Sequence, residues 1–186
     1  MAVLTLNPIA DGAGYVAFDG STYARHTDAV LLRNGAPSGA NPHQAPFMFY
    51  PVAGLLALAG LIQAVHFLWT VSDSTPTDAT VGVGFHDATI ESADASLFAS
   101  VRNINNGYAT QIVNATVRGP FVTDLGAGGV AAIESFILEE LDIGFGLDYA
   151  SGAATWGCTL SQYLLRITYT GASAKRARRR MMGVGR

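Results

Sequence analysis

The four histidines are the first residues to consider for chemistry, because imidazole binds metal ions and transfers protons near neutral pH. They are His26, His43, His66 and His86, and no two of them are spaced as H-x-H or H-x-x-x-H. His66 and His86 lie in alternating segments and could face each other on neighbouring strands as a metal pair. A metal site needs three or four converging ligands. The pattern therefore favours side chains on a polar face, and we expect no metal site and no cofactor.

Carboxyl and hydroxyl groups gather in the segment 133–142, I-E-S-F-I-L-E-E-L-D. Glu139, Glu140 and Asp142 could supply the two carboxylates of a glycoside hydrolase, which lie about 5 to 9.5 Å apart across a cleft, but a solvated acidic face is the simpler interpretation. Ser135 does not lie in G-x-S-x-G, the pattern of a nucleophile elbow. The glycine-rich loop at 125–129 lacks the lysine of a phosphate-binding loop. We therefore expect no catalytic residue and a protein that is not an enzyme.

Cys158 and the N-terminal residues bear on two further questions: whether the chain has a disulfide or a zinc site, and whether it has a signal peptide. Cys158 is the only cysteine, so neither an intrachain disulfide nor a cysteine-based zinc site can form, and we expect it to be a small buried side chain. The opening M-A-V-L-T-L-N-P has no basic region followed by an apolar stretch and a cleavage site, so we expect no signal peptide. In a chain that is not secreted, the glycosylation sequence at Asn114, on a predicted strand, is interpreted as a chance match.

The charges are split between the body of the chain and its C-terminus. All 14 acidic residues lie at or before Asp148, whereas six of the 11 basic residues lie in the last 12 positions. Residues 1–170 carry 5 basic and 14 acidic side chains, a balance of −9, and the remaining residues carry +6. We therefore divide the chain into a body, residues 1–170, and a basic C-terminal arm, residues 171–186. Such an asymmetry indicates a charged partner for the arm.

The arm contains the sequence A-K-R-A-R-R-R-M-M-G-V-G-R, which has three interpretations. It can neutralise nucleic-acid phosphates, pair with carboxylates of a neighbouring subunit through bidentate arginine contacts, or remain a solvated chain end. We favour an ordered contact with another protein chain, in which the two methionines supply an apolar anchor, and nucleic acid stays open as the alternative partner. The expected partner-binding residues are Lys175, Arg176, Arg178, Arg179, Arg180, Met181 and Met182.

The elements that would position these groups depend on residues 51–73, the longest apolar stretch of the chain. As a helix, residues 51–71 would be long enough to cross a bilayer, which takes about 20 apolar residues. As a strand, the second half alternates, with Leu61, Val65, Phe67, Trp69 and Val71 on one face and Gln63 as the exception. Two glycines, two polar residues within the stretch and a β-branched, aromatic end favour strands. We therefore expect buried strands and no membrane contact.

The rest of the chain shows short alternating segments separated by turn residues, which is typical of a sandwich or jelly roll. Only 13% of the residues are charged, about half the usual fraction, which suits a subunit that buries surface against neighbours. Residues 131–142 have helical spacing, and Asn105-Asn106-Gly107 predicts a hairpin within 96–118. The other expected strands are 1–9, 14–18, 29–33, 46–50, 80–87, 143–149 and 162–170, with a loop at 34–46. The expected fold is an all-β, jelly-roll-like β-sandwich of nine or ten strands with one short helix and the basic C-terminal arm.

Two regions resemble jelly-roll virion proteins of tailed bacteriophages. The opening L-T-L-N-P-I-A-D-G-A-G-Y-V-A-F, residues 4–18, is similar to the T-L-x-P-x-x-D strand with which such proteins often begin. The ending F-I-L-E-E-L-D-I-G-F-G-L-D-Y-A-S, residues 136–151, is followed by Y-L-L-R-I-T-Y-T, residues 163–170. Together they resemble the short helix, the x-x-G-hydrophobic strand and the V-x-V-x-Y-T-like strand at the end of these proteins. The resemblance covers most of residues 1–170 and excludes the 34–46 loop and the arm.

The resemblance implies a structural role, as a minor tail component, a capsid decoration protein or a domain that presents a host-binding surface. We therefore expect a non-enzymatic component of a phage virion that contacts other virion subunits, forms a homo-oligomer and uses the arm to hold adjacent subunits. Two alternatives stay open. One is a carbohydrate-binding or host-surface-binding module of the same fold, in which Trp69, Trp156 and tyrosines on an exposed face would stack on sugars. The other is a small membrane protein anchored by residues 51–71.

Overall fold

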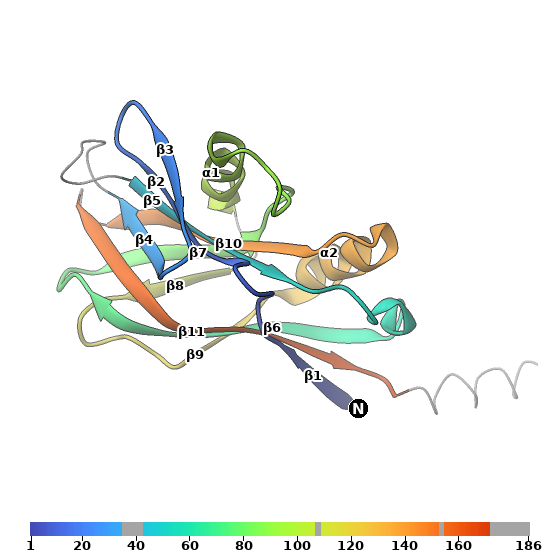
Figure 1. The fold of residues 1–186 in the computed structure, drawn as a ribbon. Coiled ribbons are helices and arrows are strands. Elements are labelled where there is room, and N and C mark those ends of the chain that lie inside the picture. The colour runs from blue at the N-terminus through green and yellow to red at the C-terminus, as the bar shows by residue number, and fades with distance from the viewer. Residues whose placement is uncertain (35–42, 107–108, 153–154, 172–186) are drawn as a thin grey trace, which may run out of the picture.

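Two long antiparallel strands, β6 (Ile62–Ser74) and β11 (Trp156–Tyr169), form the centre of the fold in this computed structural model. Their pairing places Leu165 directly opposite Phe67. The structure describes the whole chain except residues 35–42, 107–108, 153–154 and 172–186. Other strands attach on either side of this pair (Figure 1), so β6 and β11 determine where the remaining strands lie.

Strand β6 confirms the alternation expected for residues 61–71. Val65, Phe67 and Trp69 are fully buried and Leu68 is half-buried on the outer side, while Gln63, the expected exception to the alternation, is exposed. Alternate residues of a strand point to opposite faces, so the apolar residues that alternate in the sequence lie on the core face.

The first half of the apolar stretch, residues 51–61, is not a strand. It forms turns and the short 3₁₀ helix η1 (Leu56–Leu58), with Gly54 and Gly60 at φ of +82° and +69°. Positive φ values of this size favour glycine and end regular structure there. Among the described residues, no helix combines the length and the apolar character needed to span a membrane.

The strands belong to one antiparallel sheet that curves into a nearly closed β-sandwich (Figure 1). The main order is β8–β7–β10–β5–β4–β11–β6–β9, while β1 pairs with β11, and β2 pairs with β3 and β5. Strand β4 links the two layers, because it pairs with β11 along its length and with β5 at Arg33↔Gln44. The remaining bounds are β1 (Ala2–Leu6), β2 (Ala13–Phe18), β3 (Tyr23–His26), β4 (Val30–Asn34), β5 (His43–Tyr50), β7 (Ala79–Phe85), β8 (Ala109–Val113), β9 (Phe121–Asp124) and β10 (Ile143–Gly152).

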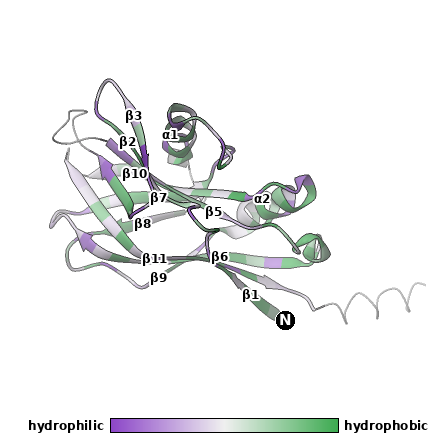
Figure 2. Cartoon of the chain, in the orientation of Figure 1, coloured by the Kyte–Doolittle hydropathy of each residue, from purple (hydrophilic) through white to green (hydrophobic). Residues whose placement is uncertain are grey.

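Aromatic and branched side chains from both layers fill the interior of the sandwich, and Figure 2 shows apolar residues recurring along these strands. The rings of Phe67 and Phe145 are 4.5 Å apart, and those of Trp69 and Phe121 are 4.6 Å apart. The indole N–H of Trp69 donates to Thr123 Oγ1 at 3.0 Å, so its polar atom is satisfied inside the core. These contacts join β6, β9 and β10 around one hydrophobic core.

Residues 94–106 are helical where the sequence pattern predicts a strand. Helix α1 (Asp94–Arg102) continues into the 3₁₀ helix η2 (Asn103–Asn106), so the predicted hairpin within 96–118 is wrong and only part of its second strand exists, as β8. Leu97 and Val101, four residues apart, are both buried against the sheet. Spacing by four residues places side chains on one helix face, and this short segment fits helical spacing as well as alternation.

Small residues on β10 let α1 and η2 pack directly on the sheet. Phe145 and Leu147 belong to the core of the sandwich, whereas Gly144 and Gly146 face outward. A Cβ added at Gly146 would lie 3.0 Å from Val101 Cγ1. The alternation I-G-F-G-L therefore creates an apolar inner face and a flat outer face for helix packing.

A second helix, α2 (Gly126–Glu139), packs against β6 and β7 at one end of the sheet (Figure 1). It begins before the expected helix 131–142, so the glycine-rich segment 125–129, expected as a loop, forms the N-cap and first turn of α2. Ile133 and Ile137 are buried in the core, and the helix ends where Glu140 adopts a left-handed φ of +57°. The expectation of one helix is thus corrected to two α-helices in the described part of the chain.

Arg25, on a strand that the sequence analysis missed, fastens α1 to the sheet. Its Nε donates to Asp94 Oδ1 at 3.0 Å, its Nη1 donates to the Ile90 carbonyl at 2.7 Å, and its Nη2 donates to the Ser92 carbonyl. Its guanidinium lies 5.5 Å from the centre of the Phe47 ring. Lysine cannot reproduce this planar set of donors. We expect Arg25→Lys to lower the free energy of unfolding by about 2 kcal/mol and to increase hydrogen exchange in α1 more than in β6.

The matched control is Arg33→Lys, because Arg33 is an exposed arginine on β4, the next strand along the chain. Urea denaturation of both variants measures the loss of stability, and hydrogen exchange shows where the structure loosens. The role given to Arg25 is wrong if α1 exchanges equally in the two variants.

Candidate interaction site

A cavity of about 440 Å³ lies between the two helices and the end of β7. Its lining combines aromatic rings with carboxylates, hydroxyls and one imidazole, including Phe85, His86, Asp87, Ser135, Phe136 and Glu139. The groups come from segments that are distant in the sequence, so no local motif announces the cavity. We call it the interhelical cavity.

His86 is the buried polar group of the interhelical cavity. It is only 5% exposed, and its ring stands edge-on to Phe49 with the centroids 5.3 Å apart. Burial lowers the pKa of His86 to about 4, against the opposing effects of Asp87 and of the Phe145 and Ala88 carbonyls. The imidazole is therefore neutral at physiological pH, and neither ring nitrogen makes a hydrogen bond of good geometry to the described chain.

The hydroxyl groups at the cavity are already used by carboxylates. Ser100 Oγ donates to Asp87 Oδ1 at 2.8 Å, and Ser135 Oγ donates to Glu139 Oε1 at 2.8 Å. Neither serine is hydrogen-bonded to His86, so these groups are not arranged as a nucleophile with its base. The arrangement suits binding of a donor-rich cation, because it presents the carboxylates of Asp87 and Glu139 beside aromatic rings.

The proposed histidine pair does not form. His66 lies on β6 and His86 follows β7, and these two strands are not neighbours in the sheet. The possibility that His66 and His86 face each other on neighbouring strands is therefore excluded, and the metal pair that was not favoured does not form. Within the described ranges, no group of three or more histidine, cysteine or acidic residues is placed to hold a metal ion.

The acidic residues at the end of α2 are exposed, as expected. They are Glu139, Glu140 and Asp142. Ion pairs in the described part of the chain join Arg25 to Asp94, Arg102 to Asp148 and Arg118 to Asp73. Within that part, no lysine or arginine is paired with the three carboxylates, so this end of the molecule keeps its negative charge. We call these three residues the acidic cluster.

The chain leaves the described body close to α2. The Thr170 N–H donates to the Leu61 carbonyl at 3.0 Å, and the adjacent Gly60 N–H donates to Glu134 Oε1 of α2 at 3.0 Å. The end of β11 and the C-terminal part of α2 thus lie at the same end of the molecule (Figure 1). The expected partner-binding residues of the arm, Lys175, Arg176, Arg178, Arg179, Arg180, Met181 and Met182, lie outside the described residues, so their role stays a prediction.

The outer face of β11, β6 and β9 carries a row of three apolar side chains. Leu68 is directly opposite Leu164 on one neighbouring strand and Val122 on the other. Val122 is 57% exposed, and the two leucines are half-buried. Alternation in the sequence places Leu68 on this face, but the row depends on strand register, which the sequence analysis did not predict. We call these three residues the apolar row.

Both tryptophans are buried, which removes the feature on which the carbohydrate-binding alternative depended. Trp69 and Trp156 are 0% and 1% exposed, and the indole N–H of Trp156 donates to the Thr77 carbonyl at 3.0 Å. Neither ring can stack on a sugar at the surface. The expectation for Cys158 is confirmed: it is buried, and burial raises the pKa of its thiol to about 12.

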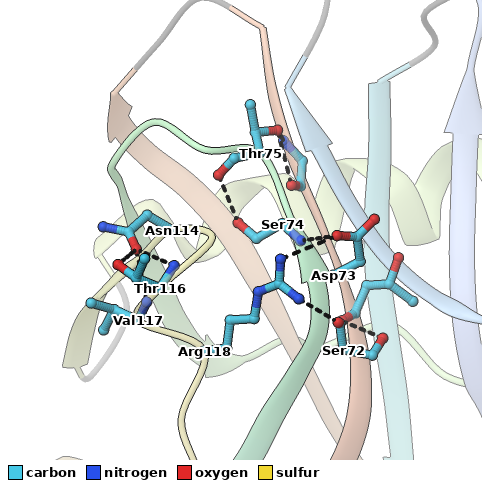
Figure 3. Close-up of polar contacts among 10 residues, drawn as sticks. Ser72, Asp73, Ser74, Thr75, Asn114, Thr116, Val117 and Arg118 are labelled. Atoms are coloured by element: carbon cyan, nitrogen blue, oxygen red, sulfur yellow. Dashed lines mark hydrogen bonds and ion pairs between the residues drawn. The ribbon is translucent and has the colours of Figure 1, made fainter.

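A polar network ties the loop between β8 and β9 to the end of β6 (Figure 3). Arg118 Nη1 donates to the Ser72 carbonyl at 2.8 Å, and Arg118 Nη2 lies 3.4 Å from Asp73 Oδ1. Asn114 follows β8 instead of lying on a strand, and its Oδ1 accepts the Thr116 N–H at 2.8 Å in a tight turn. Side-chain capping of this kind stabilises turns, so the network has a structural role.

Comparison with known proteins supplies no further assignment. No protein-family model matches the chain, and no curated protein matches it. The function is therefore inferred from the residues and geometry described above.

Proposed function

We propose that this protein is a non-enzymatic structural subunit of a bacteriophage virion, of the minor tail or capsid decoration type, and that it forms homo-oligomers. The resemblance of residues 4–18 and 136–170 to jelly-roll virion proteins supports the virion class and the jelly-roll topology. The nearly closed antiparallel sandwich is compatible with that topology. The apolar row supports assembly, and it is the observation that carries the proposal.

The apolar row suits contact with another subunit. Apolar side chains that lie together at a protein surface are a common feature of protein–protein contacts when the patch is large, and a neighbouring subunit can extend this row. Strand β9, which carries Val122, pairs in the described chain only with β6, so it leaves one unpaired edge that can pair with another chain. Each Å² of apolar surface covered there contributes about 25 cal/mol. Association through this face therefore removes both an apolar surface and an open edge.

The cavity chemistry supports a binding role over catalysis. The serine hydroxyls donate to carboxylates, and the neutral His86 is not hydrogen-bonded to either of them. The basic arm adds a second means of association, with other virion subunits as its partners and nucleic acid as the alternative.

The test of assembly is Val122→Lys in the full chain. We expect the wild-type protein to be a soluble oligomer without detergent, and we expect the variant to dissociate at least about tenfold more readily, because a buried unpaired charge opposes association. Light scattering on a size-exclusion column across a dilution series measures this. The thermal midpoint should be almost unchanged, since Val122 is exposed in the subunit.

The matched control is Leu56→Lys, because Leu56 is 56% exposed but lies in the 51–61 turn region, away from the apolar row. It should leave the oligomer intact. A wild-type chain that stays monomeric at every concentration would refute the homo-oligomer, and equal dissociation of both variants would refute the role of this face.

A further inference from the structure

We propose that the interhelical cavity and the acidic cluster beside it form the binding site for the basic C-terminal arm of a second copy of this chain. The inference rests on the proposed assembly function and adds the surface that receives the arm. Its occupant is the segment of residues 175–182, and the group that enters the cavity is an arginine side chain.

Charge complementarity is the first reason. The body carries −9 and the residues after it carry +6. The acidic cluster has no paired lysine or arginine in the described chain; its member Glu139 lines the cavity, and Asp87 adds one further carboxylate there. Arginine forms bidentate hydrogen bonds with carboxylates, which are stronger than neutral ones.

The chemistry of the cavity is the second and independent reason. Asp87 and Glu139 are exposed at the cavity wall, and each accepts only one hydrogen bond from a serine hydroxyl there. Guanidinium has five donors and no acceptor, and a carboxylate accepts several hydrogen bonds, so both carboxylates keep acceptor capacity for it. Phe85 and Phe136 supply ring faces on which a guanidinium plane can stack. The cavity thus combines the acceptors, the negative charge and the aromatic surface that arginine needs.

Exposed leucines beside the acidic cluster are the third reason. Leu138 and Leu141 are 67% and 43% exposed and flank Glu139 and Glu140 in the sequence, and Leu141 also lines the cavity. Met181 and Met182 follow directly after the arginines in the arm. Methionine is flexible enough to fill an irregular apolar surface, so the arm matches the site in both its basic and its apolar part.

The assembly proposed above favours a second copy over the same chain, because contact between subunits brings the arm of one copy to the surface of another. Strand β11 ends at the same end of the molecule as α2 (Figure 1). The 15 residues after Gly171 can span up to about 50 Å when extended, which is enough to reach a neighbouring subunit.

The first experiment measures the site directly in a full-length chain whose own arm is neutralised by K175Q, R176Q, R178Q, R179Q and R180Q. A fluorescent peptide of residues 172–186 is titrated into this protein, with fluorescence anisotropy as the readout. We expect saturable binding that weakens with salt. Adding E139Q, E140Q and D142N should weaken it at least about tenfold, because bidentate charged contacts are lost.

A matched control carries D11N, D28N and E91Q, which change the net charge equally at residues that do not line the cavity. It should change the affinity by less than about threefold, through screened long-range charge alone. Replacing both methionines of the peptide with serine should also weaken binding. Absence of binding, or equal weakening by the two triple variants, overturns the proposed site.

The second experiment distinguishes a neighbour's arm from the chain's own arm. The arm-neutralised chain is mixed with a chain that carries E139Q, E140Q and D142N but keeps its basic arm. In the mixture, the intact arm of one protein meets the intact site of the other, so we expect hetero-association beyond that of either protein alone, measured by sedimentation velocity. Peptide binding without hetero-association overturns the assignment to a second copy. If the wild-type protein itself stays monomeric, the proposed assembly function is wrong. The peptide titration then still shows whether the cavity binds the arm.

Discussion

Replacing Arg102 with methionine is expected to lower the free energy of unfolding by about 3 kcal/mol at neutral pH. Arg102 lies in the last turn of α1 and forms an ion pair with Asp148, whose side chain is fully buried on β10. Methionine keeps much of the apolar length but removes the cation. A buried carboxylate that loses its partner charge is strongly destabilising, because water cannot solvate it.

The loss of stability in Arg102→Met should depend on pH, because the pKa of Asp148 is shifted from its ordinary value. Burial raises its pKa from 3.8 to about 6, although Arg102 and the Tyr149 N–H oppose the rise. The folded state therefore binds this proton more tightly than the unfolded state. The contribution of Asp148 is most favourable below pH 4 and falls by about 3 kcal/mol as the pH rises to 6 and above. The difference in the free energy of unfolding between wild type and Arg102→Met should accordingly be small near pH 4 and largest above pH 6.

His86 changes the stability with pH in the opposite direction to Asp148, over an overlapping pH range. Its folded pKa of about 4 lies below the ordinary value of 6.5, so its contribution to stability is lost as the pH falls through this range. The total stability of the wild type can therefore change little between pH 4 and 6. The effect of Asp148 is therefore measured as the difference in the free energy of unfolding between wild type and Asp148→Asn. This variant removes the contribution of Asp148 and keeps that of His86.

A double-mutant cycle of Arg102→Met and Asp148→Asn isolates the ion pair from the other contacts of Arg102. Urea denaturation at pH 4 and at neutral pH supplies the four free energies at each pH. We expect a coupling energy of about 2 kcal/mol or more at neutral pH and much less at pH 4. A coupling that does not change with pH contradicts the assignment of the raised pKa to Asp148.

Replacing Gly144 with alanine is expected to lower the free energy of unfolding by about 3 kcal/mol. An added Cβ would lie 2.6 Å from the His86 carbonyl oxygen and 2.7 Å from both Cε1 and Nδ1 of its ring. Strand pairing holds the backbone at this point, because the His86 N–H donates to the Gly144 carbonyl at 3.1 Å. The ring cannot move inward without meeting Phe49, so the clash is relieved only by separating the strands or displacing His86.

Gly82→Ala is the matched control on the adjacent strand β7. The nearest atoms to its added Cβ are 3.7 and 3.8 Å away, which is ordinary contact. We expect a change of less than about 1 kcal/mol there, of the size found for tolerated substitutions. Thermal unfolding compares the two variants, and the peptide titration described above shows whether the displaced His86 also weakens binding of the arm. Equal stability of the two variants would show that His86 is not held as the structure indicates.

The strand elements were largely predictable from the sequence, because alternation in a strand maps directly onto its two faces. Val65, Phe67 and Trp69 recur at every second position, and all three are buried in β6. Residues 14–18, 29–33 and 143–149 were expected as strands and are largely so in β2, β4 and β10. The exposed position of the acidic cluster also followed from the sequence, because charged residues at a helix end are solvated unless they are paired.

Tertiary structure overrode the local pattern in α1. Leu97 and Val101 fit a strand or a helix in so short a segment, and the helix is accommodated by packing on the sheet, where Gly146 allows Val101 a close approach. The 51–61 segment shows the same limit, since its apolar composition does not reveal that Gly54 and Gly60 take positive φ. The exposure of Trp69 and Trp156 was likewise undecided by residue type, because tryptophan suits both a core and a sugar-binding face.

The sequence by itself determined the sandwich class, the division of charge between body and arm, and the lack of a local catalytic motif, since composition and alternation are local properties of the chain. Only the tertiary structure decided which distant groups meet. Strand register aligned Leu68 with Leu164 and Val122, and helix packing brought His86, Asp87 and Glu139 to one cavity. These groups are brought together by long-range pairing and packing, whose geometry no local spacing of residues encodes.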